Sequence, residues 1–143
     1  MHNLLLALHV LTAVFAIGPL AHAATTASRG VRTADADATA GSARMARLYG
    51  YASVIVVLFG MSLVRPKWHA EFGDTWVWLA LVLWAVAIAL LLVVLVPALD
   101  RATDIIRAGD PVGPLKARVA ASGGIIGLIF AVIVFLMVYR PGK

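Results

Sequence analysis

The sequence predicts an all-α membrane protein built as a bundle of four transmembrane helices. Hydrophobic residues make up 62% of the 143 residues and charged residues only 13%, whereas soluble domains carry roughly 25% charge. The mean hydropathy is +0.96. Four long runs contain no Asp, Glu, Lys or Arg, and they cover residues 4–24, 48–64, 76–99 and 119–139. We expect the whole chain, residues 1–143, to form a single integral membrane domain.

Each of the four runs is long enough to cross a bilayer as a helix. A span of roughly 17–25 residues, rising about 1.5 Å per residue, matches a hydrocarbon core of about 30 Å. Lipid offers the backbone no hydrogen-bond partners, so each run must satisfy its own amides and carbonyls. Four apolar runs therefore predict four helices.

The first run has a second interpretation, as a cleavable export signal. Ala21-His22-Ala23 has the small-x-small form of a signal-peptidase site. A signal, however, begins with basic residues and has a short apolar centre, whereas only MHN precedes this run and the run is about twice as long. We therefore expect a first membrane span, in which Pro19 predicts a kink near Ala16.

The basic residues predict the orientation of the spans. The connections 25–47 and 100–118 lie on one side of the membrane and hold eight Lys and Arg residues, against four on the other side. The positive-inside rule then places these connections in the cytoplasm and both termini outside. Trp68, Trp76 and Trp78 would form an outer aromatic belt. The basic residues are scattered between apolar runs, which argues against nucleic acid as a partner.

The connection 25–47 has no pattern of a phosphate-binding loop or a metal site. It is rich in Ala, Ser and Thr, with two aspartates among four arginines. We expect a solvated, partly helical connector. Contact of Arg44 and Arg47 with anionic lipid is the alternative.

Local signals predict where the third span begins and ends. Asp74 should cap its start. Asp104 and Arg107 are three residues apart and should pair on a helical extension of the span. Gly109 and Pro111 should end that extension.

The last span contains the strongest signal for close helix packing. Small residues recur four apart and so lie along one side of the helix, where another backbone can approach closely. These residues are Ala120, Gly123, Gly124, Gly127 and Ala131. Ala85 and Ala89 of the third span form a weaker ridge and are the expected opposing surface. We expect packing within the bundle, with docking onto another subunit as the alternative.

His9 is the main candidate for a functional side chain, because an ionisable group within a span is costly and usually has a purpose. His9 and His22 lie about 20 Å apart along one helix, too far to share a metal ion. The other three spans contain no histidine, so one chain cannot supply bis-histidine haem ligation. We expect a neutral His9 that is hydrogen-bonded inside the bundle. Ligation of haem or copper, or contact with another protein, are the alternatives.

The sequence does not favour an enzyme. The spans contain no carboxylate, and their hydroxyl and histidine side chains show no spacing that would assemble a nucleophile and a base. The chain has no cysteine, which excludes thiolate metal sites. We expect no catalytic residue, no metal site and no resident cofactor, with haem or copper at His9 as the one alternative.

Two stretches carry a resemblance to a known family. The start LLALHVLTAVFAIGPL and the end VIVFLMVYRPGK resemble the DUF2269 family of predicted four-helix bacterial membrane proteins. This resemblance implies four spans in a bacterial inner membrane but no established activity. The first helix is also similar to that of copper-resistance D-type and haem-associated membrane proteins, which implies a ligand role for His9. Those relatives commonly have a tryptophan a few residues later, where this sequence has Phe15 and Ala16.

Two functions follow from these observations. The first is a non-catalytic accessory subunit that packs onto a larger membrane complex, with a respiratory, electron-transport complex as the expected host. The second is a haem- or copper-binding membrane protein that uses His9. The expected partners are the lipid bilayer and other membrane-protein subunits.

The predicted orientation can be tested with single cysteines at Ser42 and Gly73. An impermeant thiol reagent added to intact cells should label the cysteine at Gly73, because that connection is expected outside, and leave Ser42→Cys unlabelled. Labelling of Ser42→Cys alone would reverse the orientation.

Overall fold

The computed structural model describes residues 2–65, 67 and 71–141, and all elements within them are helices. Helix α1 spans His2–Arg32, α2 spans Ala36–Ser62 and α5 spans Leu115–Tyr139. Between α2 and α5, helix α3 (Thr75–Leu90), the π-helical turn η2 (Leu91–Leu95) and α4 (Val96–Arg107) form one continuous helix of 33 residues. These four helices are long and apolar enough to cross a membrane, which confirms the predicted fold class.

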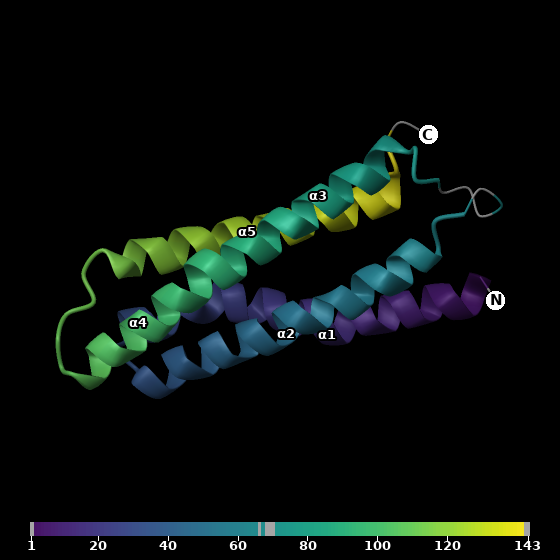
Figure 1. Cartoon of the computed structure of the whole chain (residues 1–143). Helices are drawn as coiled ribbons and strands as arrows, with labels where there is room; N and C mark the ends of the chain where they lie inside the picture. The colour runs from purple at the N-terminus through teal and green to yellow at the C-terminus, as the bar shows by residue number, and fades with distance from the viewer. Residues whose placement is uncertain (1, 66, 68–70, 142–143) are drawn as a thin grey trace.

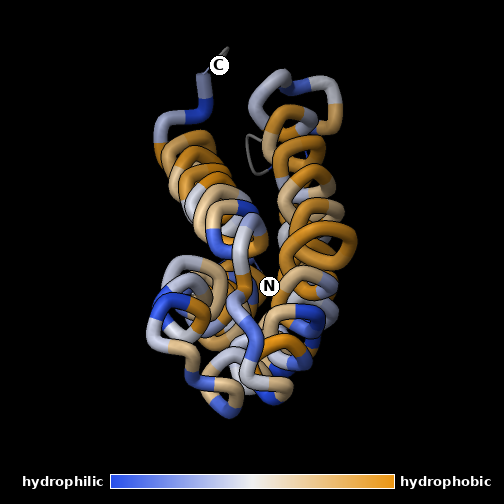
Figure 2. The backbone as a smooth tube through the Cα atoms, turned by 90° about the vertical axis from the view of Figure 1, so that its left-hand side faces the viewer, coloured by the Kyte–Doolittle hydropathy of each residue, from blue (hydrophilic) through white to orange (hydrophobic). Residues whose placement is uncertain are grey.

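The helices form two antiparallel pairs, α1 with α2 and α3 with α5 (Figure 1). Both termini lie at one end of the bundle, which we name the terminal end. The opposite end holds the turns 33–35 and 108–114, and we name it the basic end. The two pairs lie close together toward the basic end and diverge toward the terminal end. Figure 2, viewed from the basic end, shows hydrophilic residues gathered there and apolar residues along the helices.

The first connection is much shorter than predicted. Helix α1 continues to Arg32 and α2 begins at Ala36, so only residues 33–35 join them. The connector expected over residues 25–47 is helical, as predicted in part, but its predicted length is wrong, because the turn between the helices holds only residues 33–35. Alanine favours helix strongly, and this stretch is rich in alanine, so the helices extend well beyond the apolar runs.

Backbone hydrogen bonds close this short turn. The amides of Ala34 and Asp35 donate to the carbonyls of Val31 and Gly30 at 3.2 and 2.9 Å, which is the Schellman pattern of a helix end. Ala34 accordingly adopts a left-handed conformation with φ of 52°. The Asp35 carboxylate then accepts from the amide of Ala38 at 3.0 Å and caps the start of α2.

Helices α1 and α2 pack through small residues with the spacing of a coiled coil. Their buried positions recur in alternating steps of four and three residues. They are Ala16, Leu20, Ala23, Ala27 and Gly30 on α1, and Thr39, Ala43, Ala46, Gly50 and Ser53 on α2. At Gly30 the two helices almost touch, since an added Cβ would lie 3.0 Å from Oγ1 of Thr39. Much of the core therefore lies in the residues expected to form a connector.

The small-residue face of α5 packs on α1. A Cβ added at Gly123 would overlap the carbonyl oxygen of Ala24, and a Cβ added at Gly127 would lie 2.7 Å from Cγ2 of Thr25. The predicted opposing surface is therefore wrong, because Ala85 and Ala89 of α3 are exposed. Two glycines one helical turn apart let α5 approach the α1 backbone.

Three further members of the predicted face do not take part in this contact. Ala120, Gly124 and Ala131 are exposed, and an added Cβ at Gly124 would meet no atom within 4 Å. The close contact with α1 thus involves fewer residues than the pattern of small residues contains.

The end of α4 follows the prediction, but its ion pair does not. Gly109, two residues after the last helical residue Arg107, has a φ of 78°, and its amide donates to the carbonyl of Ile106. Arg107 lies 3.9 Å from a carboxylate oxygen of Asp37 on α2. The expected pairing of Arg107 with Asp104 is therefore replaced by a contact between helices.

At the terminal end, Asp74 occupies the N-cap position of α3, but its side chain makes no capping hydrogen bond to the helix. It accepts instead from the amide of Glu71 at 2.9 Å. Trp76 is buried beneath the Arg140 guanidinium, which lies 5.4 Å from the ring centroid, and Trp78 is exposed. Trp68 lies outside the described residues.

The contact between α5 and α1 predicts opposite outcomes at two adjacent glycines. Gly123→Leu should destabilise the protein by about 3 kcal/mol or more, because the new side chain collides with backbone that cannot move aside. Gly124→Leu is the matched control and should leave stability unchanged. Thermal unfolding in detergent measures both, and equal melting temperatures for the two variants would contradict this packing.

Candidate functional site

His9 lies half-buried on α1 and faces α2. Its Nδ1 atom is 3.0 Å from the carbonyl oxygen of Val56. The imidazole lies over Gly60, where an added Cβ would come within 2.9 Å of Cε1 of His9. The ring thus occupies the space left by the missing side chain of Gly60.

The contact with Val56 selects the protonated nitrogen of His9. A carbonyl oxygen only accepts hydrogen bonds, so Nδ1 carries the hydrogen and donates. In the neutral ring, Nε2 then keeps its lone pair. This is the arrangement expected of a neutral histidine bonded inside the bundle. It is also the arrangement of many metal-binding histidines, whose second nitrogen donates to a carbonyl while Nε2 binds the metal.

The described residues place no cluster of His, Asp or Glu side chains around His9. No three His, Asp or Glu side chains among them lie close enough together to hold a metal ion. His22 lies thirteen residues further along the same helix, and His69 is outside the described residues. The described part of the chain therefore offers a metal or haem one nitrogen at this position.

A second polar contact joins α2 to α3 within the apolar region. Nε1 of Trp84 donates to Oγ of Ser53 at 3.0 Å, and the Ser53 hydroxyl donates to the carbonyl of Gly50 at 2.6 Å. Ser53 is fully buried, so both hydrogen bonds avoid the cost of an unpaired polar group in lipid. Trp84 was not among the predicted site residues. The sequence feature that could have identified it is its position in the middle of a span, away from the interfaces where tryptophan is enriched.

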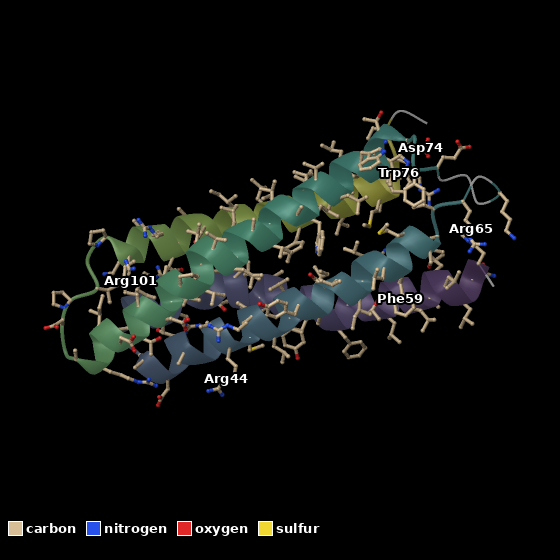
Figure 3. The ribbon with its side chains drawn as sticks, in the orientation of Figure 1. Arg44, Phe59, Arg65, Asp74, Trp76 and Arg101 are labelled. Carbon is tan, nitrogen blue, oxygen red and sulfur yellow. The ribbon has the colours of Figure 1, made fainter. Side chains whose placement is uncertain are left out.

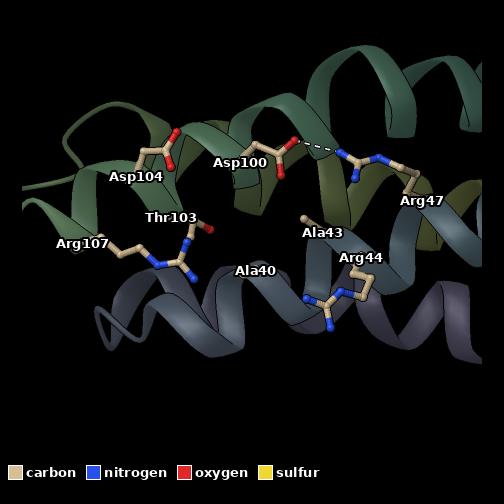
Figure 4. Close-up of a pocket in the computed structure, with 8 residues that line it drawn as sticks. All are labelled: Ala40, Ala43, Arg44, Arg47, Asp100, Thr103, Asp104 and Arg107. Carbon is tan, nitrogen blue, oxygen red and sulfur yellow. Dashed lines mark hydrogen bonds and ion pairs between the residues drawn. The ribbon is translucent and has the colours of Figure 1, made fainter.

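At the basic end, charged residues of α2 and α4 line a recess of about 360 Å³ (Figure 4). Nη2 of Arg47 lies 2.9 Å from Oδ2 of Asp100, and both side chains are about half exposed. Such an exposed pair contributes about 0–1 kcal/mol to stability. The recess is lined by Ala40, Ala43, Arg44, Arg47, Asp100, Thr103, Asp104 and Arg107. Carboxylates thus offset most of the basic charge in this recess, which weakens its attraction for an anion.

The predicted site residues do not converge on one place. His9 lies in the terminal half of the bundle, whereas Gly123 and Gly127 contact α1 at Ala24 and Thr25, more than four helical turns from His9. The structure therefore contains a histidine contact, a close helix contact and a polar basic end as separate features.

One protein family matches the chain over nearly its whole length. No curated protein and no solved structure matches the chain. The model of the DUF2269 family, described as a predicted integral membrane protein, matches residues 3–141 and so covers nearly all of the four helices. The chain therefore belongs to the DUF2269 family of predicted integral membrane proteins, as the resemblance of its first and last spans predicted.

Proposed function

We propose that this protein is a non-catalytic accessory subunit that packs onto a larger complex in a bacterial inner membrane. Its termini face outward and its basic end faces the cytoplasm. The expected host is a respiratory, electron-transport complex. The observation that carries the proposal is the exposure of the terminal half of α1.

No residue of α1 between His2 and Phe15 is fully buried, and the first buried residue on this helix is Ala16. The two helix pairs diverge in this half of the molecule (Figure 1), so α1 lacks the close contact with α5 that it makes near Ala24. Leu4, Leu11 and Phe15 lie along one stripe of the helix and are 57%, 54% and 67% exposed.

This exposed stripe supports docking onto another helix. Association of helices in lipid depends on van der Waals packing and interhelical hydrogen bonds, since burial of apolar surface has no driving force there. The terminal half of α1 makes a side-chain hydrogen bond to α2 through His9, and leaves a continuous apolar face unpacked. A neighbouring subunit would supply the missing packing.

The interface can be tested with two matched double variants. Leu11→Ala with Phe15→Ala should reduce recovery of host subunits in mild detergent by tenfold or more, because truncating hot-spot side chains near an interface centre costs about 1 kcal/mol or more each. Leu128→Ala with Phe135→Ala removes the same two side chain types from exposed positions of α5 and should leave recovery unchanged.

Quantitative mass spectrometry of the co-purified proteins measures this difference. Enrichment of respiratory subunits with the wild-type chain is expected, and enrichment of a different complex would refute the host. Equal recovery with both double variants would refute the α1 interface.

Binding of haem or copper at His9 is the second candidate function, and the hydrogen bond to Val56 favours it. That bond leaves Nε2 as the nitrogen available to a ligand, and Nε2 has no hydrogen bond to the described residues. The fit is incomplete for copper, which needs more than one ligand atom, whereas a haem can be held by a single histidine. A second copper ligand would have to come from another chain or a small molecule.

An absorption spectrum and a copper assay of the purified protein distinguish the two functions. For the accessory subunit we expect no Soret band and no bound copper, and His9→Leu should remain folded at a cost of about 2 kcal/mol or less. His22→Leu is the control. A Soret band or a stoichiometric copper content that His9→Leu abolishes and His22→Leu retains would establish the second function instead.

A further inference from the structure

Two arginines share a recess between α4 and α5 at the basic end. Arg101 of α4 and Arg118 of α5 line one side of it, and Figure 3 shows Arg101 at the opposite end of the bundle from Arg65 and Trp76. The recess has a volume of about 360 Å³. Its other lining residues are Val93, Val94, Pro97 and Ala98.

The charge of this recess is unbalanced. Its lining residues include two arginines and no acidic residue. Arg101 and Arg118 form no ion pair with an acid of the described residues, whereas Arg47 and Arg107 each reach an aspartate. Two like charges at one recess repel each other, and an anion between them would turn this repulsion into attraction.

The apolar side of the recess points toward the membrane interior. Val93, Pro97 and Arg101 follow one another at intervals of four residues, so they lie on neighbouring parts of one helix face over about 12 Å. Val93 is 72% exposed. The recess therefore runs from cationic groups at the helix ends to apolar surface within the span.

The backbone at this point is irregular. Val93 and Val94 belong to the π-helical turn η2, and Pro97, two residues after its end, has no amide hydrogen to donate. Helix α4 packs mainly on α2, which leaves its side toward α5 open. The proline and the wide turn thus shape a recess that a regular helix packed against α5 would close.

We propose that this recess binds one anionic phospholipid. Its phosphate lies between the guanidinium groups of Arg101 and Arg118, and an acyl chain follows Pro97 and Val93 into the bilayer. Guanidinium groups bind phosphate through paired hydrogen bonds, and basic pockets between membrane helices are suited to lipid headgroups. The recess between α2 and α4, whose arginines are paired with aspartates, should bind no such lipid tightly.

Native mass spectrometry of the full chain in detergent, titrated with phosphatidylglycerol, tests this proposal. The wild-type chain should bind one molecule, and Arg101→Gln with Arg118→Gln should weaken binding about 30-fold. Arg32→Gln with Lys116→Gln is the matched control. It removes two exposed charges from the same end but none from the recess, and it should bind as the wild type does.

Further measurements distinguish phosphatidylglycerol from other ligands and keep the test valid if the double Gln variant does not fold. Phosphatidylcholine should bind at least about tenfold more weakly than phosphatidylglycerol, a difference of the same order as the loss expected for the double Gln variant. Inorganic phosphate at about 10-fold excess should not displace the lipid. Arg101→Lys with Arg118→Lys should bind more tightly than the double Gln variant but more weakly than the wild type, because the charge is retained while the paired hydrogen bonds of the guanidinium groups are lost. If the double Gln variant fails to fold by circular dichroism, each single Gln variant should bind about fivefold more weakly.

Three results would overturn the proposal. These are unchanged phosphatidylglycerol binding in the folded Gln variants, an equal loss in the Arg32 and Lys116 control, and equal affinity for phosphatidylcholine. Binding of phosphate without binding of phosphatidylglycerol would reassign the recess to a free anion.

Discussion

The close approach of neighbouring backbones to α1 is the constraint on which the rest of the bundle depends. Lipid gives helices no hydrophobic reason to associate, so contact distance decides which helices stay together. On one side Gly30 of α1 lies against Thr39 of α2, and on the other Gly123 of α5 lies against Ala24. Helix α1 thereby joins the two pairs of helices, and their separation at the terminal end follows from the loss of such contacts beyond Ala16.

The membrane architecture could be predicted from the sequence because it follows from the positions of the apolar and charged residues. Long apolar runs without Asp, Glu, Lys or Arg cross as helices, and four of them give an even number of crossings with both termini at one end. The ends of the helices could not be predicted in this way. Hydropathy measures transfer into lipid, whereas residues 25–32 and 36–47 form helix because alanine favours it and small side chains pack closely.

The candidate sites were only partly predictable, for a related reason. A pattern on one helix identifies a face but not the helix that covers it, so Gly123 and Gly127 were found while their partner on α1 was not. His9 stood out as an ionisable residue in a span, but its partner is the backbone carbonyl of Val56, an atom that every residue possesses. What distinguishes that position is Gly60 one turn later, where no side chain competes with the imidazole.

The π-helical turn η2 gives one membrane-crossing helix two different facing directions. A π turn holds about one residue more than an α turn, so it rotates everything after it by about 100° relative to an uninterrupted α-helix. The helix uses this rotation, since α3 before the turn packs mainly on α5 and α4 after it packs mainly on α2. The turn also sets where Asp100 and Arg101 point, because both follow it within two helical turns. Deletion of a single residue from Leu91–Leu95 would therefore rotate α4 relative to α3. The deletion would change the helices that α4 contacts while leaving the sequence of α4 unaltered.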